Sequence, residues 1–113
     1  MFLVRSLGPL LLTALLTPIA FSQSASQTLT NCAQILGLTL EAANRESPAV
    51  VTGVVTCYVP SSQLCFVQDG TAGVYVYPSP WPKDLAPGTI VTVDGATGAG
   101  RFSPILQRAR ITP

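Results

Sequence analysis

The sequence predicts a small all-β barrel. From residue 50 onward, short runs rich in β-branched and aromatic residues alternate with turn signals about every 8 to 12 residues, which is typical of barrels and sandwiches. The chain shows no internal repeat and no heptad pattern that would favour another architecture. Closing a sheet on itself also removes the exposed strand edges that otherwise promote aggregation.

Five strands are expected. Gly53 lies inside the first of them, where it lets the strand bend and serve both halves of a barrel. We therefore predict a five-stranded OB-fold-like barrel, with an SH3-like barrel as the alternative. The expected strands are residues 50–59, 64–69, 73–78, 89–95 and 105–111.

The last expected strand alternates apolar and polar residues. Its pattern places Leu106, Arg108 and Arg110 on one face, and Ile105 to Ile111 at every second position on the other. The glycine-rich residues 95–100 precede it. Neither a Gly-Lys-Ser/Thr triplet nor a helix follows them, so we expect a loop that leads into the strand and not a phosphate-binding loop.

One short helix is expected before the strands. Thr39 is a suitable N-cap, and Glu41 with two alanines follows it. Pro48 biases Ser47 toward extended geometry, so the helix must end there, after about two turns.

The first 22 residues are predicted to be a secretory signal peptide. Arg5 gives a positive start, a short apolar run follows, and Ala20 and Ser22 supply the small side chains needed at a cleavage site. The run contains two prolines and is shorter than the roughly 20 apolar residues of a membrane span. We expect cleavage after Ser22, a periplasmic or secreted location, and no stable membrane span in the mature chain.

The rest of the chain is expected to be one domain. Removal of 22 of the 113 residues leaves 91, which divide into a polar, flexible leader over residues 23–35 and the barrel over residues 36–113. Without Arg5, five basic and five acidic residues remain, and this neutrality argues against a nucleic-acid partner. With no histidine and one lysine, the sequence predicts no enzymatic activity, no metal site and no cofactor.

Three cysteines are present. If the hairpin between the first two strands is centred on Ser61, Cys57 and Cys65 lie opposite each other, and we expect a disulfide between them. The alternative is two buried free thiols. Cys32 would then be the unpaired cysteine in the leader.

The strand sequences together resemble a known family. Their motifs are an L-T-x-E-A-A helix, a GVVT strand, an FVQD hairpin followed by GVYV, a PGTxVxVxG strand, and GxFSPxL before the last strand. Over residues 36–112 this pattern is similar to the OB-like extracytoplasmic domain near the N-terminus of many bacterial sensor histidine kinases. The resemblance implies sensing or binding. The transmembrane, dimerisation and ATP-binding regions of such kinases do not follow here, so no kinase activity is expected.

The expected function is therefore that of a non-enzymatic, extracytoplasmic sensory or binding module. Its partner would be a small ligand or an envelope protein. Two alternatives stay open: an OB-fold that binds an oligonucleotide or oligosaccharide, and a structural envelope protein or the remnant of a truncated gene.

Aromatic side chains are the main candidates for ligand contact, because OB-folds stack bases or sugars on strands two and three. Phe66 and Tyr75 are equally suited to filling the core, and Trp81 to closing a barrel end. Asp69 and its neighbouring glycines, Gly70 and Gly73, are expected to form a turn, with one glycine at positive φ. The candidate ligand-contact residues are Gln68 and the aromatic residues Tyr58, Phe66, Tyr75, Tyr77, Trp81 and Phe102.

The only basic grouping in the sequence consists of Arg101, Arg108 and Arg110. These residues are candidates for holding an anionic ligand. The alternative is that they protect a strand edge from pairing with another chain.

Overall fold

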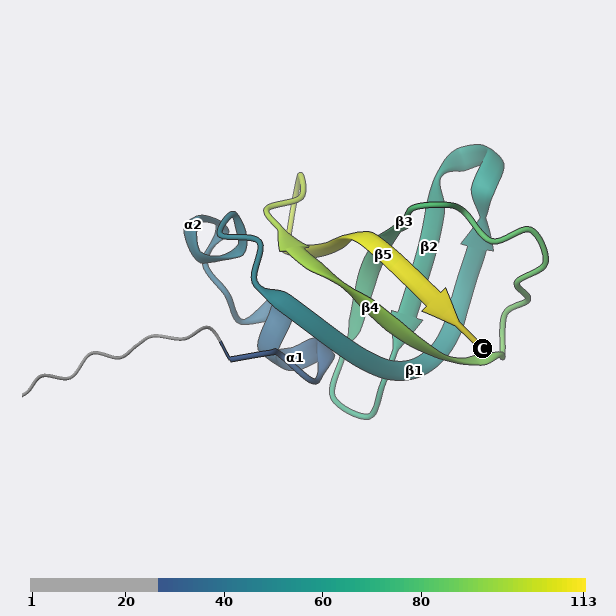
Figure 1. Cartoon of the computed structure of the whole chain (residues 1–113), viewed down its shortest axis with the longest axis horizontal. Helices are drawn as coiled ribbons and strands as arrows, with labels where there is room; N and C mark the ends of the chain where they lie inside the picture. Colours follow the sequence, from purple (N-terminus) through teal and green to yellow (C-terminus); the bar gives the residue numbers. More distant parts are fainter. Residues whose placement is uncertain (1–26) are drawn as a thin grey trace, which may run out of the picture.

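A computed structural model describes residues 27–113 (Figure 1). The predicted signal peptide and its cleavage site lie outside these residues. The described chain is a closed barrel of five strands, which are adjacent in the order β1-β2-β3-β5-β4. The strands are β1 (Pro48–Val59), β2 (Leu64–Gln68), β3 (Gly73–Pro78), β4 (Ile90–Gly98) and β5 (Ile105–Thr112).

This architecture confirms the predicted small all-β, OB-like barrel. Strands β1, β2 and β3 form an antiparallel meander, β5 runs parallel to β3, and β4 closes the barrel against β1. Strand bounds agree with the predicted ones within two residues, except that β4 continues to Gly98, into the expected glycine-rich loop.

Strand β1 serves both halves of the barrel. Its first part pairs with β4 and its second part with β2, and Val54 has partners on both sides. Gly53 lies at this change of partner, where a Cβ atom would stand 2.5 Å from the backbone oxygen of Gln68. The prediction that β1 serves both halves of the barrel is confirmed. Glycine is required at position 53 because only a residue without a side chain lets β1 and β2 approach this closely.

The core consists mainly of valines that alternate with outward side chains along the strands. Strand β5 contributes Leu106 and Ala109, and the N-terminal segment contributes Cys32 and Ile35. The hydrophobic core residues of the strands are Ala49, Val51, Val55, Cys65, Val67, Val74, Val76, Val91, Val93, Leu106 and Ala109, and Pro78 and Thr97 are fully buried strand residues as well.

A helix that the sequence analysis missed closes one end of the barrel (Figure 1). Helix α1 (Cys32–Leu36) begins at the N-cap Asn31, whose side chain accepts a hydrogen bond from the Gln34 N–H at 2.8 Å. Just before it, Leu29 pairs in parallel with Ala49 of β1. The prediction of a flexible leader over residues 23–35 is therefore wrong for residues 29–35, which pack on the barrel.

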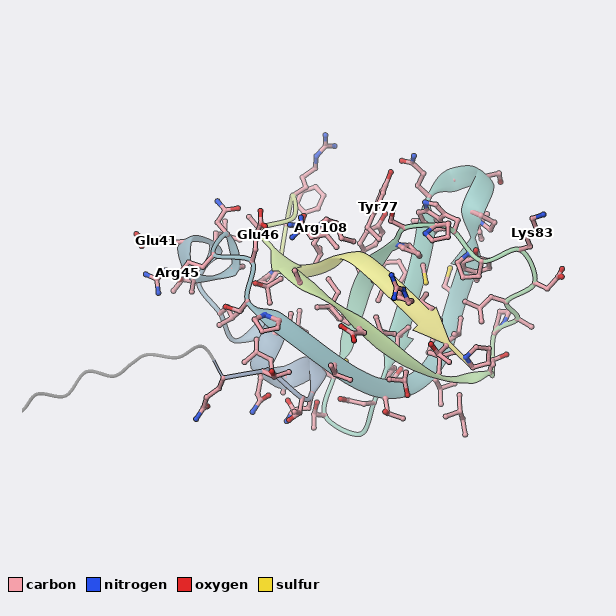
Figure 2. The ribbon with its side chains drawn as sticks, in the orientation of Figure 1. Glu41, Arg45, Glu46, Tyr77, Lys83 and Arg108 are labelled. Carbon is pink, nitrogen blue, oxygen red and sulfur yellow. The ribbon has the colours of Figure 1, made fainter. Side chains whose placement is uncertain are left out.

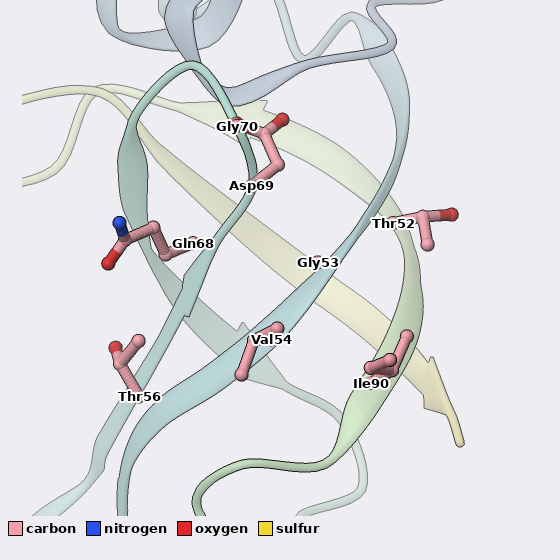
Figure 3. A pocket seen from close by; sticks show the side chains of 8 residues that line it. All are labelled: Thr52, Gly53, Val54, Thr56, Gln68, Asp69, Gly70 and Ile90. Carbon is pink, nitrogen blue, oxygen red and sulfur yellow. The ribbon is translucent and has the colours of Figure 1, made fainter.

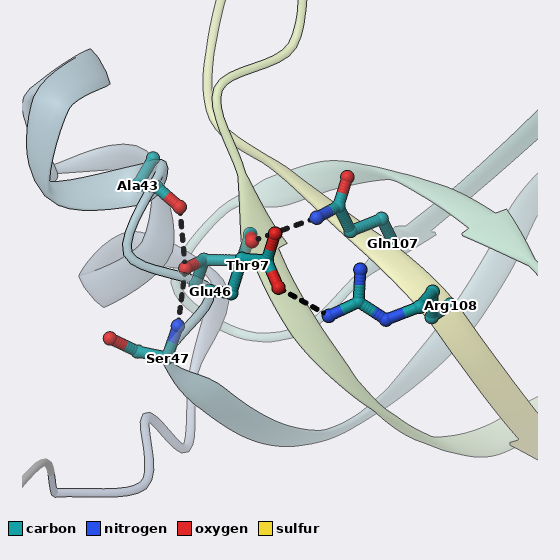
Figure 4. Close-up of polar contacts among 6 residues, drawn as sticks. All are labelled: Ala43, Glu46, Ser47, Thr97, Gln107 and Arg108. Atoms are coloured by element: carbon teal, nitrogen blue, oxygen red, sulfur yellow. Dashed lines mark hydrogen bonds and ion pairs between the residues drawn. The ribbon is translucent and has the colours of Figure 1, made fainter.

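Helix α2 (Leu40–Ala43) confirms the predicted N-cap Thr39, whose hydroxyl accepts a hydrogen bond from the Ala42 N–H at 3.0 Å. It is shorter than predicted, because the chain turns at Asn44 and the buried Thr97 binds both sides of that turn (Figure 4). The Thr97 hydroxyl donates to the Ala43 carbonyl at 2.8 Å and accepts from the Ser47 N–H at 2.9 Å.

The prediction of a disulfide between Cys57 and Cys65 is wrong, because all three cysteines are free. The 3₁₀ turn η1 (Pro60–Ser62) shifts the hairpin centre, and a β-bulge at Thr56 adds a residue to β1. Cys57 consequently lies opposite the outward Phe66, whereas Cys65 is fully buried opposite Tyr58. The two thiols belong to opposite faces of the sheet.

Because of a second bulge, the residues of β5 that face the core differ from those predicted. Arg108 has a φ of 49°, and the pairing of β5 with β4 shifts by one residue at this position. Leu106 and Ala109 are therefore both buried, while Arg108 and Arg110 are exposed. The prediction that Leu106 shares a face with the two arginines is wrong, because strict alternation does not survive a bulge.

Candidate functional site

Phe66 and Tyr75 form the centre of the outward face of β2 and β3. They are direct partners across the two strands, and their ring centroids lie 5.4 Å apart at an interplanar angle of 84°. This edge-to-face arrangement is a favoured geometry for aromatic pairs. Phe66 is 37% exposed, and Tyr75 is half-buried. The core is filled by the valines on either side, so Phe66 and Tyr75 are surface residues and not core residues.

Trp81 joins two further predicted residues at the other end of this face. Its ring centroid lies 5.3 Å from that of Tyr77 and 6.0 Å from that of Tyr58. Tyr58 and Trp81 pack against the core, and the Tyr58 hydroxyl donates to the carbonyl of Pro82. Trp81 is thus partly buried against the core, whereas Tyr77 is more exposed and projects outward (Figure 2).

Gln63 links the aromatic residues and was not among the predicted site residues. Its backbone carbonyl accepts a hydrogen bond from the Tyr75 hydroxyl, and its side-chain Nε2 donates to the Tyr77 hydroxyl at 3.3 Å. Burial, with the nearby Tyr77 as a smaller cause, raises the pKa of Tyr75, so its hydroxyl stays protonated at neutral pH. Gln63 sits in the turn after η1 with a φ of 57°. The only signal in the sequence that could have identified Gln63 is its position in a turn sequence.

A groove of about 320 Å³ runs beside Phe66 and Tyr75. Its other wall is the loop between β4 and β5, from Gly100 to Ser103, together with Ile105. Gly100 has a φ of 64°, and a Cβ atom there would stand 2.1 Å from the Ser103 carbonyl oxygen, so the loop requires glycine at this position. Phe102, in this loop, is 90% exposed.

The three predicted arginines do not form one group. Arg108 donates to Glu46 at 2.8 Å (Figures 2 and 4), and Arg110 lies opposite Asp94 of β4. Arg101 alone lines the aromatic groove. The structure therefore brings together Phe66, Tyr75, Arg101 and Phe102 from the predicted set, and leaves Arg108 and Arg110 outside the groove.

Gln68 lies in a second hollow, of about 510 Å³, on the outside of β1 (Figure 3). Val54 forms its floor, between Gln68 of β2 and Ile90 of β4. The predicted contact residues are thus divided between two surfaces. The lining residues of this hollow are Thr52, Gly53, Val54, Thr56, Gln68, Asp69, Gly70 and Ile90.

The hydrogen bonds of Asp69 confirm the prediction that it is a turn residue. Its Oδ1 accepts hydrogen bonds from the N–H groups of Thr71 and Ala72 and from the Thr71 hydroxyl, at 2.8, 3.1 and 2.6 Å. Burial alone would raise the pKa of Asp69, but the hydrogen bonds outweigh it and lower the pKa far below its usual range. The expectation of a positive φ at Gly70 or Gly73 is wrong, since neither has one.

Residues 27–113 contain no group of three or more His, Cys, Asp or Glu side chains placed to hold a metal ion. Nor do they include a helix with the length and apolar character of a membrane span.

No protein-family model matches the chain, and no curated protein matches it significantly.

Proposed function

We propose that the protein is a non-enzymatic binding module that holds a ligand on the outward face of β2 and β3, in an extracytoplasmic sensory role of the kind that the resemblance to histidine-kinase domains implies. The observation that carries this proposal is Phe102, which is 90% exposed beside the half-exposed pair of Phe66 and Tyr75. Exposed aromatic side chains that line one groove are typical of a binding site.

The loop around Phe102 supports the proposal. Gly100 gives this loop a backbone that other residues cannot adopt without a clash, so Phe102 is presented from a defined position. Burial of a Phe side chain stabilises a fold by roughly 1.5–3 kcal/mol. Because Phe102 is exposed, its ring contributes almost none of this free energy to the folded chain. A ligand that covers the ring would gain part of it on binding.

The groove also supports a role in binding and not in catalysis. Its polar side-chain groups are the hydroxyls of Tyr75 and Ser103 and the guanidinium of Arg101, and the Tyr75 hydroxyl already donates to the Gln63 carbonyl. No carboxylate, thiol or imidazole that would act as a general base lines it. The face lies where OB-folds receive oligonucleotides and oligosaccharides, on strands two and three beside the loop between strands four and five. Both ligand classes therefore belong in the first screen.

The test is a thermal-shift screen of anions, sugars and short oligonucleotides against the folded domain and two variants. Phe102→Ala removes an exposed ring from the groove wall. Ile90→Ala is the matched control, because Ile90 is 65% exposed and lies in the other hollow. We expect at least one ligand to raise the Tm of the wild type and of Ile90→Ala, and to lose this effect in Phe102→Ala.

A ligand shift that survives in Phe102→Ala but disappears in Ile90→Ala would contradict the proposed face. Absence of any ligand shift across the screen would favour a structural envelope protein or a gene remnant.

A further inference from the structure

We propose that the groove binds a small anion that carries a flat ring, with the ring against Phe66, Tyr75 and Phe102 and the negative charge at Arg101. This inference rests on the proposed binding function and names the chemistry of its ligand.

The charge of the groove is that of one arginine. Arg101 is the only charged side chain among the lining residues, and no carboxylate lies among them. Within residues 27–113 the one ion pair joins Arg108 to Glu46, which leaves the Arg101 guanidinium free of an ion-pair partner there. A guanidinium stays charged at all physiological pH values and presents a planar set of donors that matches a carboxylate or phosphate. A free guanidinium in a groove without acids favours an anionic ligand.

The walls of the groove favour a ring. Phe66 and Tyr75 hold each other at 84°, so neither ring needs a ligand to fix its orientation. Phe102 supplies a third ring from the facing loop. Flat rings stack on such side chains because the polarised edges and faces of aromatic groups attract one another.

The size of the groove limits the ligand. Its 320 Å³ lies near the lower end of the roughly 300–1,000 Å³ that is common for small-molecule sites. One cation neutralises one anionic group, whereas a nucleic-acid strand is held by a series of Lys and Arg side chains along its backbone. The groove therefore suits a single ring with one acidic substituent better than a polyanion.

Two sources share this chemistry: an aromatic carboxylate and a mononucleotide phosphate. The experiment separates them with matched probes in NMR titrations of the ¹⁵N-labelled domain. Benzoate is compared with the neutral benzamide, and dTMP with the neutral thymidine. The protein variants are Arg101→Gln and, as a control, Arg110→Gln, since Arg110 is also an exposed arginine of the same domain but lies outside the groove.

We expect one acid to bind at Phe66, Tyr75 and Phe102 about fivefold more tightly than its neutral counterpart, an effect typical of one exposed charge pair with hydrogen bonds. Arg101→Gln should reduce this ratio to about one, and Arg110→Gln should leave it unchanged. The preference for the acid should also weaken as salt is raised.

Two results would overturn the inference while leaving the proposed function in place. One is equal affinity of the acid and its neutral counterpart for the wild type, with shifts at the groove. The other is an acid preference that persists in Arg101→Gln. Absence of shifts at the groove with all four probes also overturns the inference, and the broader ligand screen then decides the proposed function separately.

Discussion

The carboxylate of Asp69 accepts a hydrogen bond from the backbone N–H of Cys32, 2.9 Å away, and so joins the turn between β2 and β3 to helix α1. The Thr71 hydroxyl accepts a second bond of this kind from the Ala33 N–H at 3.0 Å. These two N–H groups belong to the first turn of α1, where helical backbone donors have no partner within the helix. The hairpin turn thus caps the helix that covers the end of the barrel.

Replacement of this carboxylate should loosen the attachment of α1. Asp69→Asn removes the charge that four donors share, and we expect a loss of about 2 kcal/mol in the free energy of unfolding at pH 7. The pKa of Asp69 is lower in the folded chain than its unfolded value of about 3.9. Its contribution is therefore fully present above about pH 5 and declines as the pH falls below about 4 toward the folded pKa.

Urea unfolding of the wild type and Asp69→Asn at pH 7 and pH 3 checks this prediction. The difference between them should be smaller at pH 3. Asp84→Asn is the control, because Asp84 is exposed and its side chain makes no hydrogen bond within residues 27–113. A difference that is the same at both pH values would show that the charge of Asp69 does not stabilise the fold.

Alanine substitutions at Gly53 and Gly70 test how far stability depends on the close approach of β1 and β2 at Gly53. In Gly53→Ala the new Cβ would stand 2.5 Å from the Gln68 carbonyl oxygen and 3.0 Å from a Val67 methyl carbon. We expect a loss of more than about 2 kcal/mol, since the contact is with backbone in a closed barrel. Gly70→Ala meets nothing within 4 Å and needs no positive φ, so it should be neutral or stabilise by up to about 1 kcal/mol.

Thermal unfolding of the two variants measures this contrast. Similar Tm values for Gly53→Ala and Gly70→Ala would mean that the strands can separate at Gly53 without cost.

Local sequence patterns predicted the strands well, because each buried valine alternates with an outward residue over five or more positions. They missed α1, whose only buried side chains are Cys32 and Ile35, and whose first turn is held by Asp69 and Thr71 more than 35 residues later in the chain. The bulges at Thr56 and Arg108 are seen only in the pairing of β1 with β2 and of β5 with β4, and no local sequence signal predicted them.

The candidate site, too, was predicted in part: its residues were predicted from the sequence, but their grouping in one groove was not. Phe66, Tyr75, Arg101 and Phe102 were each predicted from residue type and position. Their meeting in one groove depends on the parallel pairing of β3 with β5, which brings the loop before β5 beside β3. Arg101, Arg108 and Arg110 formed one basic grouping in the sequence, because only the folded chain shows that Glu46 lies beside Arg108 and Asp94 opposite Arg110.

The cysteines allow a direct test of the β1–β2 register. Cys57 lies on the outward side with Phe66, whereas Cys65 and Cys32 are fully buried, and burial raises the pKa of both buried thiols to about 11. A thiol reacts as its thiolate, so the two buried cysteines should be inert in the folded protein. With a thiol reagent such as DTNB, we expect at most one reactive thiol in the native state, which Cys57→Ser abolishes, and three after unfolding without reductant.

The same register predicts that a reductant has no effect on stability. A disulfide across this short loop would stabilise the fold by roughly 2–3 kcal/mol, so its reduction would lower the Tm measurably. We expect equal Tm values with and without reductant, because the bulge at Thr56 keeps Cys57 on the opposite face of the sheet from Cys65. A single titratable thiol in the unfolded, unreduced chain, together with a lower Tm on reduction, would show instead that β1 and β2 pair without the bulge.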